Sequence, residues 1–151
     1  MRLDRRWWIA IGLAVVVVAV VVLSRTVFGR SAEDCDPVRD LLAFNRAQAA
    51  LISSKESDDA GVPSVAEDAV YQQWADGLAQ RAEKVNAPDL TAHAVQMADL
   101  AAQFAAKLPR LRSDTAARAP GAPPPPVVYE MSVLNDRITD QLNQLAKACP
   151  G

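Results

Sequence analysis

The chain has 151 residues, of which 50% are hydrophobic, and a net charge of −2. Residues 31–151 hold 17 of the 18 acidic residues and 11 of the 16 basic ones, so this part carries a net charge of −6. Such a balance disfavours nucleic acids and anionic phosphate groups as partners, and it also disfavours flat binding to anionic lipid.

An apolar segment without a single charge occupies residues 7–24. About 20 apolar residues cross a ~30 Å hydrocarbon core, and there only a helix satisfies the backbone of one segment. Three arginines precede the segment and two follow it, and cationic flanks stay in the cytoplasm. We therefore predict a single-pass protein of the cell membrane, with a cytoplasmic tail over 1–6, a signal-anchor helix over 7–24, a juxtamembrane linker over 25–34 and an extracytoplasmic domain over 35–151.

Two alternatives concern the same segment. Cleavage would release a secreted helical protein, but the apolar stretch exceeds the usual length of about 7–15 residues and no A-x-A site follows it. Gly12, with Ala10 and Ala14 beside it, forms a weak helix-pairing motif. A homodimer within the membrane is therefore a further hypothesis.

The only cysteines, Cys35 and Cys149, stand at opposite ends of the predicted outer domain. In an oxidising compartment two such thiols indicate one disulfide. Two free buried thiols are the alternative. A zinc-type metal site is disfavoured, because His93 is the only histidine that could join the two thiolates.

The first two helices of the outer domain follow from apolar residues at three- and four-residue spacing. Asp36 as N-cap and Pro37 at the first helical position predict where the first helix begins. Ser64 and Glu67 have the spacing of a capping box at the start of the second. The predicted inward positions are Val38, Leu41, Asn45, Ala49 and Ile52 in the first helix, and Tyr71, Trp74, Leu78 and Val85 in the second.

The third and fourth helices have the cleaner apolar stripes. Pro109 is expected to kink or end the third helix near its last turn. The predicted inward positions are Leu90, Ala94, Met97, Ala101, Phe104, Leu108 and Leu111 in the third helix, and Val128, Met131, Asn135, Ile138, Leu142, Leu145 and Cys149 in the fourth.

Four helices of similar length predict an all-α domain, an antiparallel up-down-up-down bundle. In that topology the first helix begins and the fourth ends at the same pole. Cys35 and Cys149 then meet there, so one disulfide closes the bundle at the pole nearest the membrane. The acidic connection after the first helix lies at the opposite pole.

A proline-rich loop over residues 113–127 connects the last two helices. Its run of Pro123, Pro124, Pro125 and Pro126 favours a stiff polyproline II segment. The loop is either a plain spacer or a ligand for an aromatic groove on a partner. The four prolines and Trp74 are the candidate partner-binding residues, although Trp74 is also expected in the core.

Asn45 and Asn135 occupy inward positions on helices that are otherwise apolar there. Buried amides need hydrogen-bond partners, so we predict a buried polar pair that sets the helix register, with a small-ligand site as the alternative. His93 and Met97 lie one turn apart, but a soft-metal site needs more ligands than these two.

Neither a nucleophile elbow nor a phosphate-binding glycine loop occurs in the sequence. We therefore predict no catalytic residue, cofactor or metal. The leading hypothesis is a non-catalytic interaction or accessory subunit of the cell envelope, bound to the bilayer through residues 7–24 and to a protein partner. A small-ligand-binding, sensor-like four-helix domain is the alternative. Only six residues precede the predicted span, so a sensor would have to signal through another subunit.

Overall fold

The computed structural model describes residues 31–55 and 63–150, the side chain of Lys55 excepted. The predicted tail over 1–6, the anchor over 7–24 and most of the acidic connection lie outside the described residues. None of the helices in the described part is long and apolar enough to cross a bilayer. The anchor and the membrane location therefore stay predictions.

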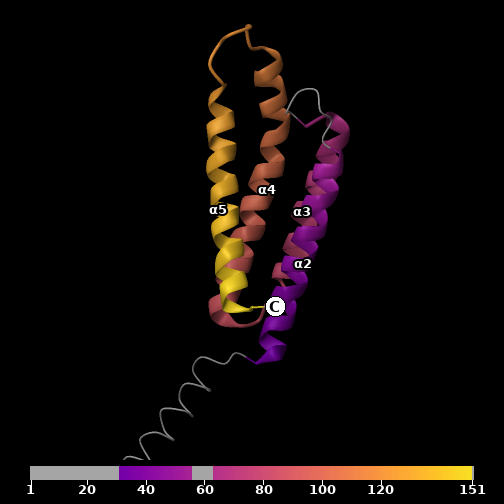
Figure 1. The fold of residues 1–151 in the computed structure, drawn as a ribbon, viewed down its shortest axis with the longest axis vertical. Coiled ribbons are helices and arrows are strands. Elements are labelled where there is room, and N and C mark those ends of the chain that lie inside the picture. Colours follow the sequence, from indigo (N-terminus) through magenta and orange to yellow (C-terminus); the bar gives the residue numbers. More distant parts are fainter. Residues whose placement is uncertain (1–30, 56–62, 151) are drawn as a thin grey trace, which may run out of the picture. The chain divides into compact units, whose positions relative to one another are not determined.

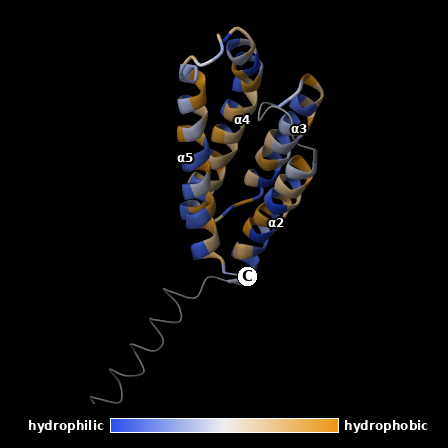
Figure 2. Cartoon of the chain, turned by 45° about the horizontal axis from the view of Figure 1, so that its top comes forward, coloured by the Kyte–Doolittle hydropathy of each residue, from blue (hydrophilic) through white to orange (hydrophobic). Residues whose placement is uncertain are grey.

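The described part contains four helices: α2 (Ala32–Lys55), α3 (Val65–Ala82), α4 (Pro88–Ala116) and α5 (Pro126–Ala148). Successive helices run in opposite directions (Figure 1). Hydrophobic and hydrophilic residues alternate along each of them, as a helix buried on one side requires (Figure 2). The predicted all-α bundle of four helices is confirmed.

The start of α2 differs from the prediction. The helix begins at Ala32, so Asp36 is not its N-cap and Pro37 lies inside it. A proline near the start of a helix removes one hydrogen bond, here the one to the Glu33 carbonyl group. Glu33 and Asp34 in the first turn favour the earlier start, because carboxylates stabilise the positive end of the helix dipole.

The start of α3 agrees with the sequence pattern. Ser64 is the N-cap, and the Glu67 carboxylate accepts a hydrogen bond from the Ser64 backbone N–H in a capping box. This reciprocal arrangement satisfies donors that the helix itself leaves without acceptors.

Pro109 does not end α4, which continues to Ala116. The turns beyond the proline are held from outside the helix, because Arg112 forms two hydrogen bonds of 2.7 Å with Asp68 of α3. The connection to α5 is accordingly shorter than the predicted loop over 113–127 and covers residues 117–125.

The core is built around α4, whose backbone lies close to those of both α3 and α5. Small buried residues at the contact allow this approach: Ala94, Ala98, Ala101 and Ala105 are 0–6% exposed. By contrast, α2 contacts α3 through larger groups. The Phe44 ring lies against Gly77, where an added Cβ would overlap it, and the Arg81 guanidinium lies 3.8 Å above the ring centroid.

The buried face of α5 is shifted from the predicted one. Met131, Ile138 and Leu145 are buried as predicted, but Val127 and Leu134 are buried in place of Val128 and Asn135. Both sets repeat every three or four residues and share Met131, Ile138 and Leu145. They differ at Val127 and Leu134, where each buried residue precedes the predicted one by one position. Contact with α4 selects the side that carries Val127 and Leu134.

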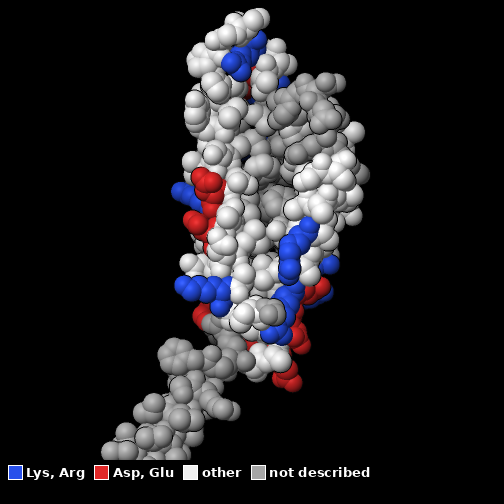
Figure 3. Space-filling model, viewed as in Figure 1, with Lys and Arg blue, Asp and Glu red and all other residues white. Residues whose placement is uncertain are grey.

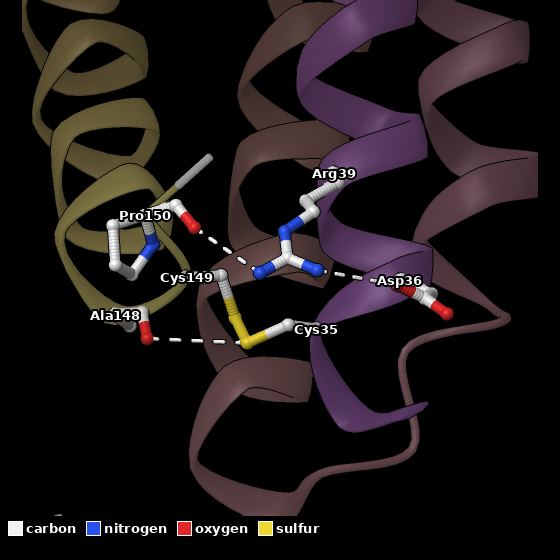
Figure 4. The surroundings of a disulfide bond; sticks show 6 residues. All are labelled: Cys35, Asp36, Arg39, Ala148, Cys149 and Pro150. Carbon is white, nitrogen blue, oxygen red and sulfur yellow. Dashed lines mark hydrogen bonds and ion pairs between the residues drawn. A yellow bond between two sulfur atoms is a disulfide. The ribbon is translucent and has the colours of Figure 1, made fainter. Parts of the chain in front are cut away.

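One disulfide joins Cys35 of α2 to Cys149 just after α5, with an S–S distance of 2.03 Å and a Cα–Cα distance of 5.4 Å. The predicted pairing is confirmed. Arg39 reaches across the bond to donate to the Pro150 carbonyl group at 3.1 Å and also pairs with Asp36 (Figure 4). We call this end of the bundle the clasp pole, and the end that holds residues 117–125 the distal pole.

Replacing both Cys35 and Cys149 with alanine should lower the free energy of unfolding by about 2–5 kcal/mol, because the bridge constrains a long loop in the unfolded chain. Urea denaturation of the full chain, followed by circular dichroism, measures this change. Wild-type protein with reductant is the control and should match the variant. Two thiols that are alkylated in the native, unreduced chain would contradict the bridge.

Candidate functional site

The bundle is hollowed in two places, once between α2 and α5 and once among α3, α4 and α5. Figure 3 shows one face of the bundle with a furrow between two columns of atoms, and charged atoms lie along the lower part of both columns. Near the clasp pole a cleft of about 410 Å³ lies between α2 and α5. Its walls are Arg39, Leu42, Asn45 and Arg46 of α2, and Leu142, Asn143, Ala146 and Cys149 at the end of α5.

A second and larger hollow, the distal cavity, has a volume of about 570 Å³ and lies towards the distal pole. The helices α3, α4 and α5 and the proline-rich connection contribute residues to it. Its apolar wall comprises Pro63, Tyr71, Phe104, Leu108, Leu111, Val128 and Met131, with Pro124 and Pro125 at one end. The polar groups are those of Thr115, Arg118, Ser132 and Asn135.

An aromatic cluster forms the inner end of the distal cavity. Tyr71 and Phe104 line the cavity with ring centroids 5.9 Å apart. Trp74 stands edge-on behind both rings, at 6.4 Å from Tyr71 and 6.2 Å from Phe104. Such T-shaped contacts are favourable for aromatic rings and fix their orientation. The three rings therefore support one another beside the cavity.

Trp74 is a core residue with 8% exposure, so it does not offer a surface for a partner. Its indole N–H donates a hydrogen bond of 2.9 Å to the Asn45 side-chain oxygen. A buried indole N–H needs such an acceptor, and Asn45 supplies it from α2. The inward amide on α2 is thus explained by the tryptophan on α3.

The predicted buried pair of Asn45 and Asn135 is wrong. Asn135 is exposed and lines the distal cavity, while the half-buried Asn45 bonds to Trp74 and lines the cleft near the clasp. The reason is the shifted face of α5, which buries Leu134 and turns Asn135 towards solvent. The two amides therefore belong to two different hollows.

The four candidate prolines do not share one environment. Pro123, Pro124 and Pro126 are exposed and Pro125 is half-buried, and Pro125 is also the N-cap of α5 and Pro126 its first residue. Pro125 has φ −64° and ψ 151°, close to polyproline II geometry. The run therefore combines an exposed stiff end with a helix start. Whether it binds a partner stays a prediction.

Two ion pairs hold the walls of the distal cavity. Arg112 of α4 and Asp68 of α3 form a two-pronged pair, and the Arg112 hydrogen bonds lower the pKa of the Asp68 carboxyl group. Lys107 of α4 lies 2.6 Å from Glu130 of α5, and this contact lowers the pKa of Glu130. Together they connect α4 to both neighbours beside the cavity.

Arg118 differs from the arginines nearby. Arg112 pairs with Asp68 and Arg110 with Asp114, whereas in the described part of the chain Arg118 has only a hydrogen bond to the Ala122 carbonyl group. It reaches the distal cavity from the connection after α4. The sequence pattern did not single out this residue, because a lone arginine near prolines gives no distinctive signal.

His93 and Met97 do not form a metal site with other residues of the described part. Met97 is completely buried, and His93 Nδ1 lies 2.7 Å from Gln141 Oε1 of α5. Within residues 31–55 and 63–150, no group of three histidine, cysteine or acidic side chains has a geometry that could hold a metal ion.

Comparisons with known proteins found no matching family model, curated protein or solved structure.

Replacing Asp68 with asparagine should destabilise the fold at neutral pH and flatten its acid denaturation. The Asp68 pKa is lowered in the folded chain, so the pair stabilises fully above the unfolded value of about 4 and loses this contribution as pH falls through the lower folded value. Urea denaturation at a series of pH values measures the difference between the two proteins, which should shrink in acid.

The matched control is Asp136→Asn, at an exposed position of α5 that does not line the distal cavity. It should leave stability almost unchanged across the series. A loss of stability in Asp68→Asn that is the same at pH 7 and at pH 2 would show that the charge of the pair contributes nothing.

Proposed function

We propose that this chain is a non-catalytic accessory protein of the cell envelope, anchored in the membrane through residues 7–24, with its helical bundle outside the cytoplasm. The uncharged segment and its arginine flanks support the anchor. The Cys35–Cys149 disulfide supports the location, because such bonds persist in oxidising compartments. Cleavage after the apolar segment would leave the same bundle in the same compartment.

The observation that carries the binding proposal is a group of four exposed, mostly apolar residues in and just after the connection between α4 and α5. It consists of Pro123, Pro124, Tyr129 and Val133, and we call it the distal surface. Tyr129 is 61% exposed and Val133 51%, one turn apart on α5 just after the exposed prolines. Tyrosine is enriched at protein interfaces, where its ring is buried and its hydroxyl group can stay in contact with water.

The partner that fits this surface is a protein with an aromatic-lined groove. Such grooves bind polyproline II segments, which lose little conformational entropy on binding because they are already extended. The distal pole is also suited to binding a protein partner. The proline connection is closed into a short loop between two packed helices, so its exposed face is held in one position.

Substitutions in the distal surface test this function. Double variants Pro123→Gly/Pro124→Gly and Tyr129→Ser/Val133→Ser should each reduce capture of a partner from detergent-solubilised membranes of the native cell about tenfold or more, as expected when interface anchors are lost. Quantitative mass spectrometry after affinity capture measures this. The bait itself should be recovered in the membrane fraction.

Val95→Ser is the matched control, because Val95 is 43% exposed on α4 and lies outside the distal surface. It should capture the partner as the wild-type chain does. Unchanged capture by both double variants, with circular dichroism spectra like the wild type, would exclude the distal surface as the interface.

A further inference from the structure

The distal cavity has the size and composition of a small-molecule site. Its volume of about 570 Å³ lies within the range of roughly 300–1,000 Å³ that ligand pockets occupy. Its walls are mostly apolar, and Tyr71, Phe104 and Met131 approach it from three different helices. A cavity between helices of a bundle is also a common position for bound ligands.

Among the described residues that line the distal cavity, the one charged side chain is basic. Arg118 lines it, and no aspartate or glutamate is among the described residues that do. This contrasts with a domain in which acidic residues outnumber basic ones. Because Arg118 has no carboxylate partner in the described part of the chain, its guanidinium group can pair with an anion that arrives from solution.

We propose that the distal cavity binds the apolar chain of a small anionic amphiphile, with the acid group of the ligand at Arg118. Each methylene group that leaves water for the apolar wall favours binding. The hydroxyl groups of Thr115 and Ser132 and the amide of Asn135 provide hydrogen bonds beside the apolar wall. This site shares Pro124 with the distal surface, but ligand binding does not require the protein partner proposed above.

The sign of the charge decides between ligands of equal chain length. A cationic amphiphile would gain the same apolar contacts and would be repelled by Arg118. A neutral alcohol would gain the contacts without the ion pair. The expected order of affinity is therefore carboxylate, then alcohol, then ammonium, with the exposed position of Arg118 limiting the difference between the first two to about two- to fivefold.

The methionines of the chain provide the probes. There are three: Met1, Met97 and Met131. Met131 lines the distal cavity, and Met97 is completely buried and does not line it. In the full chain, labelled with ¹³C at the methionine methyl groups and held in phosphatidylcholine nanodiscs without free detergent, decanoate at neutral pH should shift the Met131 signal saturably. The Met97 signal should stay in place.

Decanol and decylammonium are the comparison ligands, and Arg118→Gln is the test variant. The variant should weaken decanoate binding about two- to fivefold and leave decanol binding unchanged. Arg137→Gln is the matched control, because Arg137 is an exposed arginine on α5 that does not line the cavity. It should bind decanoate as the wild-type chain does.

Three results would overturn the proposal. The first is a Met131 signal that none of the three ligands moves. The second is equal or tighter binding of decylammonium than of decanoate. The third is equal decanoate affinity in Arg118→Gln and the wild type, with Met97 showing that the variant is folded. None of these results bears on partner capture through the distal surface.

Discussion

The covalent bond between Cys35 and Cys149 is the constraint on which the arrangement of α2 depends. The helices α3, α4 and α5 pack through alanines and aliphatic residues, with α4 in contact with both neighbours. By contrast, α2 has its fully buried residues, Cys35, Val38 and Leu41, in its first half. Beyond them it contacts α3 through Phe44 and the Asn45–Trp74 hydrogen bond. The disulfide fixes one end of a helix whose other half has little core of its own.

The backbones of α2 and α5 do not pack closely against each other, and this leaves one flank of α5 without a neighbouring helix. A bundle closed equally along all four sides would bury the flank of α5 that carries Val128, Asn135 and Leu142. Here that flank lines the cleft near the clasp and the distal cavity instead. The ion pairs Asp68–Arg112 and Lys107–Glu130 hold α3, α4 and α5 together around the distal cavity. The cavity therefore has walls on three helices that are tied to one another, and the proline connection forms one of its ends.

The sequence predicted the features that depend on local chemistry or on strong periodicity. The helices, the capping box at Ser64 and the pairing of Cys35 with Cys149 follow from spacing and from helix direction. The sequence predicted Asn135 in place of Leu134 on the buried face of α5. A repeat of three and four residues fits both positions equally well, and only the contact with α4 decides between them. The distal cavity was also missed. Phe104, Leu108 and Met131 look like core residues in a pattern, and a pattern cannot show that the space beside them is unfilled.

Hydrogen exchange along α2 tests most directly whether this helix is held mainly at the clasp pole. Amides of residues 38–45 should exchange slowly, since burial and the clasp both resist local opening, whereas those of residues 47–55 should exchange at least ~100-fold faster through local fraying. Amides of α4 should be the slowest and serve as the internal reference. Equal protection along the whole of α2, at the level of α4, would contradict the account.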